Sequence, residues 1–210
     1  MLQIAVLGSG RGSNFQAILD AIQERVIVNV SVRLVISNNS NAGIMKIAGA
    51  NAIPAVHLSR QSFPDEADFV DALLGTLEEH EVNFLVLAGY MKQLHPRIIA
   101  AYRHRIINIH PALLPKYGGK GMYGMNVHEA VVAHHDSVTG ATVHLVDEEF
   151  DHGAIVLQKE VPVLPGESPE ELAARVLEVE HEIFPRALQL FAEGKVTVAD
   201  NKVIVHHYAS

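Results

Sequence analysis

The sequence contains no cysteine among its 210 residues, so neither a disulfide framework nor thiolate catalysis is available to it. It also has no apolar run near the roughly 18 residues that a membrane-spanning helix needs. Its first residues, MLQIAVLGSG, place no charged segment ahead of their short apolar run. We therefore expect no signal peptide, no contact with a membrane and a cytoplasmic location.

An excess of basic residues is lacking as well. Lysine and arginine number 16 against 24 aspartates and glutamates, which gives a formal net charge of −8. Nucleic-acid binders usually carry a basic footprint, and this acidic chain does not. Hydrophobic residues make up 49% of the chain, enough for a substantial core. The composition predicts an ordinary globular protein that lacks the charge balance of a nucleic-acid binder, and it leaves a local basic patch possible.

Short apolar runs alternate with helix-length segments through the first half of the chain. Strands are expected at 3–8, 29–38, 54–58, 83–90 and 105–110, and helices at 13–24, 41–52, 65–81 and 95–103. The helix at 65–81 has an acidic side that should face solvent. Strands that are apolar almost throughout, separated by helices, are typical of a parallel sheet covered on both faces.

The alternation changes after residue 110. A loop rich in glycine and proline is expected up to about residue 125, followed by a helix at 126–135 and strands at 139–147 and 154–163. A long helix at 168–193 has clear start signals in Ser168, Pro169 and Glu171. Pro185 should kink this helix or end its first part. Residues 196–207 predict a small hairpin with its turn near Asp200 and Asn201.

These segments together predict one α/β domain over residues 1–210. The expected fold is a Rossmann-like, mostly parallel twisted sheet with helices on both faces and a small antiparallel hairpin near the C-terminus. Residues 1–110 would form a phosphate-binding half, and residues 111–210 would carry the catalytic loop and the rest of the site.

A glycine-rich loop, GSGRGSN at residues 8–14, joins the first strand to the first helix. Backbone N–H groups at a helix N-terminus favour an anion such as a phosphate. The loop is not the dinucleotide fingerprint, because Ser13 stands where the third glycine should be and the second strand ends in Asn38 and Asn39. The alternative is a tight turn in which Ser13 or Asn14 caps the helix.

The stretch NIHP, residues 108–111, ends an apolar strand with two polar side chains. Asn108 and His110 should project to the same side, at the carboxyl edge where α/β sheets bind ligands. The amide could donate to a developing negative charge, and the imidazole could carry protons. The alternative is that both side chains only satisfy loop backbone groups.

A second polar element follows the strand expected at 139–147. It contains Asp147, Glu148, Glu149 and Asp151, and it is closed by Gly153. A carboxylate beside His110 would raise the pKa of the imidazole and orient it. The residues alone do not choose among the four acids, and a solvated acidic turn is the alternative. Metal-binding spacings such as H-E-x-x-H are absent from the sequence, so we expect no metal.

Taken together, three segments resemble the phosphoribosylglycinamide formyltransferase family. They are GSGRGSN, NIHPALLPKYGGKG and TGATVHLVDEEFDHGAIVLQ, and the resemblance extends over nearly the whole chain. The Asn-x-His-Pro and Asp-x-Gly combination is typical of enzymes that use formyltetrahydrofolate. The resemblance implies transfer of a formyl group from the co-substrate 10-formyltetrahydrofolate to the amine of 5′-phosphoribosylglycinamide in de novo purine biosynthesis, without a metal.

The resemblance also implies residue roles. The catalytic residues would be Asn108, His110 and Asp151. The acceptor substrate 5′-phosphoribosylglycinamide, here called the ribotide, would be bound by Gly12, Ser13, Asn14 and Glu180. The folate would be bound by Met91, Lys92, Gln93, Leu94 and Asn108. Periodicity supports Glu180 independently, because it falls on a helical stripe with Val176, Ile183, Phe184 and Ala187. A carboxylate on such a stripe needs a partner, and sugar hydroxyls would supply donors.

The loop at 116–126 departs from the usual family pattern, and neither Lys120 nor Asn126 receives a role. Three alternative functions stay open. A formyltetrahydrofolate deformylase would use water as the acceptor, a methionyl-tRNA formyltransferase would need a further RNA-binding domain, and a non-catalytic protein would bind a phosphoribosyl ligand without turnover. The sequence leaves monomer and homodimer equally open.

Overall fold

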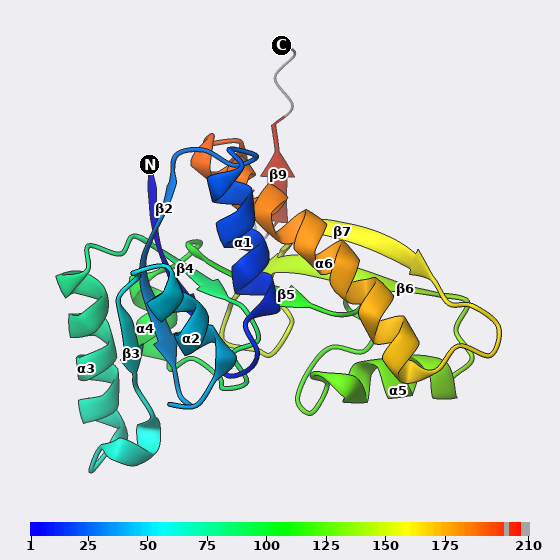
Figure 1. Cartoon of the computed structure of the whole chain (residues 1–210), viewed down its shortest axis with the longest axis horizontal. Helices are drawn as coiled ribbons and strands as arrows, with labels where there is room; N and C mark the ends of the chain where they lie inside the picture. The colour runs from blue at the N-terminus through cyan, green and yellow to red at the C-terminus, as the bar shows by residue number, and fades with distance from the viewer. Residues whose placement is uncertain (200–201, 207–210) are drawn as a thin grey trace. The chain divides into compact units, whose positions relative to one another are not determined.

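The computed structural model describes residues 1–199 and 202–206. Figure 1 shows the helices and strands of the chain with their labels. The chain divides into two compact units, residues 1–107 and the part from residue 108 onward. The expected halves, 1–110 and 111–210, differ from these units in the assignment of residues 108–110. The strand order is β3-β2-β1-β4-β5-β6-β7 in one seven-stranded sheet, and β8 and β9 form a separate two-stranded sheet. The predicted mostly parallel α/β fold with a C-terminal hairpin is confirmed.

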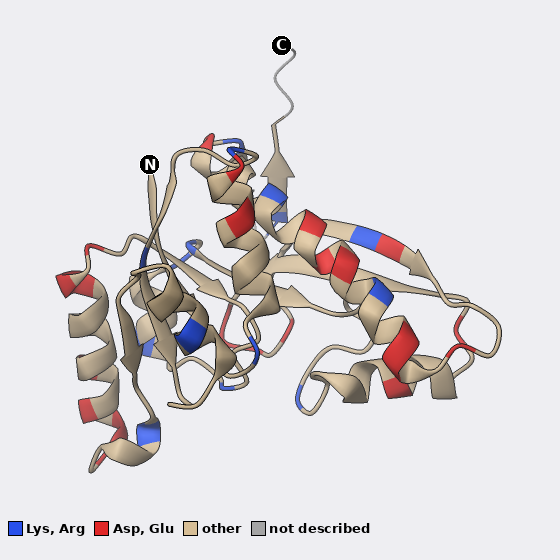
Figure 2. Cartoon of the chain, viewed as in Figure 1, with Lys and Arg blue, Asp and Glu red and all other residues tan. Residues whose placement is uncertain are grey.

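The first unit contains the strands and α-helices that the sequence predicts, in the predicted order, and one short 3₁₀ helix that it does not predict. They are β1 (Leu2–Leu7), α1 (Ser13–Gln23), β2 (Val30–Ser37), α2 (Gly43–Ala50), β3 (Ala55–His57), the short 3₁₀ helix η1 (Arg60–Ser62), α3 (Glu66–Glu79), β4 (Phe84–Leu87), α4 (Pro96–Ala101) and the start of β5 (Ile106–His110). The acidic side chains of α3 are exposed, as expected (Figure 2).

The centre of the first unit is β1, which pairs in parallel with both β2 and β4. Its last four residues have no solvent exposure, which explains why this strand is apolar on both faces. In the register, Leu7 pairs with Ile36 of β2 and with Leu87 of β4. The carboxyl ends of the three strands therefore lie level, and the segments that follow them start at the same edge of the sheet.

The second unit contains α5 (Met125–Ala133), β6 (Val138–Leu145), β7 (Ile155–Pro162) and α6 (Pro169–Ala192), followed by β8 (Val196–Ala199) and β9 (Lys202–Val205). Strand β7 runs antiparallel to β6, and α6 packs against β6, β7 and α5. Strands β8 and β9 pair antiparallel, which confirms the predicted hairpin. Its expected turn at Asp200 and Asn201 lies outside the described residues.

Helix α6 continues through Pro185, so the expectation that its first part ends there is wrong (Figure 1). A proline inside a helix removes one backbone hydrogen bond. Phe184 and Leu188 are fully buried on either side of it, and burial of two such side chains is worth about 1.5–3 kcal/mol each. The free energy gained by burying these side chains therefore outweighs the cost of the backbone hydrogen bond that Pro185 removes.

The predicted start of α6 is confirmed. The Ser168 hydroxyl accepts a hydrogen bond from the Glu171 N–H at 3.2 Å, and the Glu171 carboxylate accepts one from the Ser168 N–H at 2.8 Å. This reciprocal arrangement is a capping box.

Replacing Ser168→Ala should lower the free energy of unfolding by about 1 kcal/mol, because it removes the hydroxyl that satisfies a first-turn N–H. Urea denaturation of both proteins measures the difference. The control is Ser62→Ala, which removes an exposed hydroxyl from η1. Equal losses in both variants would contradict a specific contribution from the cap.

Candidate active site

Strand β5 places Asn108 and His110 two residues apart, with the side chain of His110 almost completely buried. The structure brings both of them to Asp151. The Nδ1 atom of His110 lies 3.5 Å from Asp151 Oδ1, and the Asn108 amide reaches the same carboxylate through His144. Three residues that were predicted to act together therefore form one cluster within the second unit.

His144, in β6, links Asn108 to Asp151 and was not predicted. Its Nδ1 lies 2.8 Å from the Leu145 carbonyl oxygen, so in the neutral imidazole the proton lies on Nδ1. Its Nε2 is then an acceptor, and the Asn108 amide nitrogen donates to it at 3.1 Å. Asn108 keeps a second N–H for another acceptor. The signal that could have identified His144 is a histidine inside an otherwise apolar strand, GATVHLV.

The imidazole of His110 has a defined orientation. Its Nε2 lies 2.8 Å from the backbone carbonyl oxygen of Tyr117, so Nε2 carries the proton and Nδ1 of the neutral ring is free to accept one. Burial lowers the pKa of His110, while the Asp151 carboxylate and the Tyr117 carbonyl act in the opposite direction and His144 adds to the lowering. The ring therefore favours its neutral, proton-accepting form near neutral pH.

Of the four candidate acids, Asp151 contacts His110, with its Oδ1 3.5 Å from Nδ1. Its Oδ2 accepts a hydrogen bond from the Gly119 N–H at 3.0 Å. Burial alone would raise the pKa of Asp151, but the imidazoles of His144 and His110, in their protonated forms, and the Gly119 N–H stabilise the carboxylate and lower the pKa overall. Asp151 is therefore ionised and able to stabilise a positive charge on His110.

Steric constraints explain why the Asp-x-Gly motif has glycine at position 153. A Cβ atom on Gly153 would lie 1.9 Å from the carbonyl oxygen of Leu145, far inside van der Waals contact. The loop that carries Asp151 can therefore approach the end of β6 only with glycine at this position. In the same loop, Asp147 pairs with the exposed His152 at 2.9 Å instead of turning inward.

The glycine-rich loop lies in the first unit and leads into α1. Gly12 is the N-cap residue and has φ of 86°, a left-handed conformation that suits glycine. A Cβ there would also lie 2.8 Å from the Cα of Ile44 in α2. No side chain caps the helix, so the alternative in which Ser13 or Asn14 caps it is wrong. All three predicted phosphate ligands, Gly12 to Asn14, are partly exposed at this helix start.

Ser9 joins this loop to the segment predicted to bind folate. Its hydroxyl donates to the Asn38 side chain at 2.6 Å and accepts from the Met91 N–H at 3.1 Å. Its backbone N–H donates to the Gly89 carbonyl at 3.0 Å. The predicted phosphate and folate segments of this unit therefore lie side by side, and Asn38 holds the loop.

The four predicted folate residues differ in exposure. Met91, Lys92 and Gln93 are exposed, whereas Leu94 is 5% exposed and belongs to the core. Glu180 is 8% exposed on the apolar face of α6, as its spacing predicts. The two residues left without a role, Lys120 and Asn126, are exposed, and the Asn126 amide donates to the Gly121 carbonyl at 3.0 Å.

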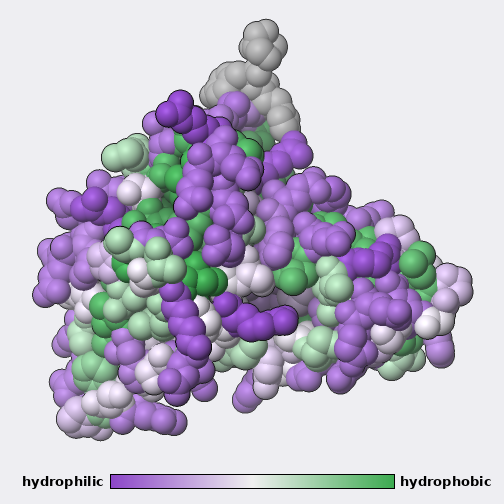
Figure 3. All heavy atoms as spheres, in the orientation of Figure 1, coloured by the Kyte–Doolittle hydropathy of each residue, from purple (hydrophilic) through white to green (hydrophobic). Residues whose placement is uncertain are grey.

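Within the part of the chain that the structure describes, no group of three or more histidine, aspartate or glutamate side chains is placed to hold a metal ion. Over the same residues, no helix is both long and apolar enough to span a bilayer. The surface turned to the viewer is mainly hydrophilic, with apolar side chains scattered over it (Figure 3).

Comparison with known proteins places these features in a family. A family model described as formyl transferase matches residues 2–188. The chain is 41% identical over 202 residues to phosphoribosylglycinamide formyltransferase from Haemophilus influenzae, covering 96% of this chain and 92% of that protein. It is 39% identical over 194 residues to the protein named phosphoribosylglycinamide formyltransferase, chloroplastic, from Vigna unguiculata. That match covers 92% of this chain and 62% of the plant protein.

The fold has a close counterpart among solved structures. The crystal structure of glycinamide ribonucleotide transformylase 1 from Symbiobacterium toebii matches with a TM-score of 0.91 and 38% sequence identity, over 98% of this chain and 94% of that one. Sequence and structure therefore agree, and the chain belongs to the formyl transferase family.

Proposed function

We propose that this protein transfers the formyl group of 10-formyltetrahydrofolate to the amine of 5′-phosphoribosylglycinamide, a step of de novo purine biosynthesis. The observation that carries the proposal is the placement of the Asp151 carboxylate 3.5 Å from His110 Nδ1, with Asn108 in the same cluster. The family and the names of the relatives supply the substrates, since formyl transferases use a formyl folate as co-substrate.

The reaction requires stabilisation of a developing oxyanion and transfer of protons. The amine nitrogen forms a bond to the formyl carbon, the carbonyl oxygen gains negative charge, and the bond from that carbon to the folate nitrogen then breaks. The amine must lose a proton and the folate nitrogen must gain one. The free N–H of Asn108 would stabilise the oxyanion, and His110 Nδ1 would accept the proton with Asp151 stabilising the imidazolium.

The proposal also assigns substrate-binding roles to individual residues. Gly12, Ser13 and Asn14 would bind the ribotide phosphate through the helix N-terminus, and Glu180 would accept hydrogen bonds from the ribose. Residues 91–94 would line the folate site with Asn108.

The purified protein should consume 10-formyltetrahydrofolate only when 5′-phosphoribosylglycinamide is present. The measurement is the absorbance of the deformylated folate, with and without the ribotide. Equal turnover without the ribotide would identify a deformylase instead. Ribotide binding without any turnover, measured by calorimetry, would identify a non-catalytic binding protein.

Asn108→Ala and Asp151→Asn should each lower kcat by at least about 100-fold, because one removes the oxyanion donor and the other the carboxylate that supports proton transfer. Steady-state kinetics with both substrates at saturation measures the effect. Asp147→Asn is the matched control, since it changes an acid of the same loop that pairs with exposed His152. A near-wild-type rate in Asn108→Ala or Asp151→Asn would overturn the assigned roles.

His110 should titrate below its ordinary pKa of 6.5, because burial disfavours the imidazolium. Asp151→Asn should lower that pKa further, since the carboxylate stabilises the charged ring. His144 also opposes protonation of His110, and His110 in turn lowers the pKa of His128. Nitrogen-15 NMR titration of the imidazole measures both values. A higher pKa in the variant would contradict the proposed pairing.

A further inference from the structure

The backbone of residues 117–119 touches both proposed catalytic groups of the second unit. The Tyr117 carbonyl accepts the hydrogen bond from His110 Nε2 at 2.8 Å, and the Gly119 N–H donates to Asp151 Oδ2 at 3.0 Å. One bond selects the tautomer of His110, and the other stabilises the ionised carboxylate. A short piece of loop therefore sets the orientation and the protonation state of the pair.

The backbone of residues 117–119 has a conformation that its local preferences disfavour. Tyr117 has φ of 57°, in the left-handed region, where a non-glycine residue costs roughly 1–2 kcal/mol. Gly118 packs closely, since a Cβ atom there would lie 2.7 Å from Leu114 Cδ2 and 3.2 Å from Asp151 Cβ. Local preference alone does not hold the Tyr117 carbonyl toward His110, so tertiary contacts must do so.

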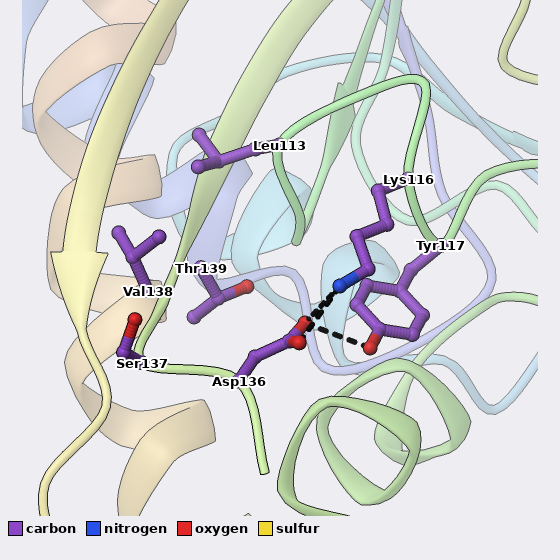
Figure 4. Close-up of a pocket in the computed structure, with 7 residues that line it drawn as sticks. All are labelled: Leu113, Lys116, Tyr117, Asp136, Ser137, Val138 and Thr139. Carbon is purple, nitrogen blue, oxygen red and sulfur yellow. Dashed lines mark hydrogen bonds and ion pairs between the residues drawn. The ribbon is translucent and has the colours of Figure 1, made fainter. Parts of the chain in front are cut away.

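Those contacts come from Asp136, which immediately precedes Ser137 and strand β6. The Lys116 ammonium donates to its two carboxylate oxygens at 2.7 and 2.6 Å, and the Tyr117 hydroxyl donates to Oδ2 at 2.8 Å (Figure 4). The hydrogen bonds from Lys116 and Tyr117 lower the pKa of Asp136, so the carboxylate is charged at neutral pH. Two consecutive loop residues are thus tied to one anion.

The three side chains converge at one wall of a pocket of about 180 Å³. Its other lining residues are Leu113, Ser137, Val138 and Thr139. In Figure 4, Lys116 and Tyr117 extend from the loop toward Asp136, which comes from the segment leading into β6. The same strand carries His144 at its far end, where it contacts Asn108. The anchor therefore joins the loop over His110 to the strand that supports Asn108.

We propose that Asp136 is a positioning residue, which holds Lys116 and Tyr117 so that the 117–119 backbone fixes the tautomer of His110 and the orientation of Asp151. Its importance for the rate rests on the proposed function, whereas its effect on the His110 ring does not. Asp136 itself acts through the loop, and Tyr117 acts through its main chain, so neither side chain needs to contact substrate.

The test is Asp136→Ala, studied by nitrogen-15 NMR of the ligand-free protein and by steady-state kinetics. The His110 signals should shift from the Nε2–H tautomer toward a mixture of both tautomers. The kcat for formyl transfer should fall roughly 10- to 100-fold, the scale expected when a reacting group is misplaced by about 1 Å. The KM for the ribotide should stay unchanged.

Two further variants serve as controls. Tyr117→Phe removes the hydroxyl but keeps the backbone carbonyl and the Lys116–Asp136 pair. It should therefore shift the His110 signals in the same direction as Asp136→Ala, but by less. This variant also provides a test if Asp136→Ala does not fold. Glu167→Ala removes a more buried carboxylate, paired with Arg175 at 2.8 Å, and should leave the His110 signals unchanged. It therefore separates positioning from a general loss of stability.

Unchanged His110 signals in Asp136→Ala and Tyr117→Phe would overturn the proposal, as would an equal shift in Glu167→Ala. The predicted NMR shift in a protein whose wild type transfers no formyl group would leave the role of Asp136 standing and overturn the proposed function instead.

Discussion

The active cluster depends on the approach of one carboxylate, Asp151, to one buried imidazole, His110. Burial alone would suppress the charge on each of them, because a low-dielectric environment disfavours both the carboxylate and the imidazolium. The structure counters this with contacts to each group. Asp151 receives the Gly119 N–H and lies beside His144, and His110 donates to Tyr117. These contacts keep Asp151 ionised and offset part of the cost of charging His110, whose pKa burial still holds below its ordinary value.

Several features of the second unit follow from this requirement. Gly153 allows the loop of Asp151 to approach the end of β6, and Gly118 allows the 117–119 backbone to lie against Asp151. His144 occupies a buried position in β6, where an apolar side chain would pack without cost, and it uses that position to orient the Asn108 amide. One strand and two loops therefore support the same cluster, and the two glycines stand where a loop backbone lies too close to its neighbours for a Cβ atom: the Leu145 carbonyl at Gly153, and the Leu114 and Asp151 side chains at Gly118.

Much of this could be predicted from the sequence. The order of helices and strands follows from apolar periodicity, and the side-by-side placement of Asn108 and His110 follows from the two-residue repeat of a strand. The capping box at Ser168 is equally local. Helix α6 does not end at Pro185, because the free energy lost locally at the proline is smaller than that gained by burying the residues around it. At the start of α1, the alternative in which Ser13 or Asn14 caps the helix is wrong, since Gly12 occupies the N-cap position.

What the sequence by itself determined is the local chemistry: which strands form, where they end, and which side chains can accept or donate a proton there. The tertiary structure decided which of four acids meets His110, that His144 stands between Asn108 and Asp151, and that Asp136 anchors the loop above them. These contacts join residues up to several dozen positions apart in the chain. Chain separation carries no signal of such proximity, because it arises only when the strands pair and the loops close over their ends.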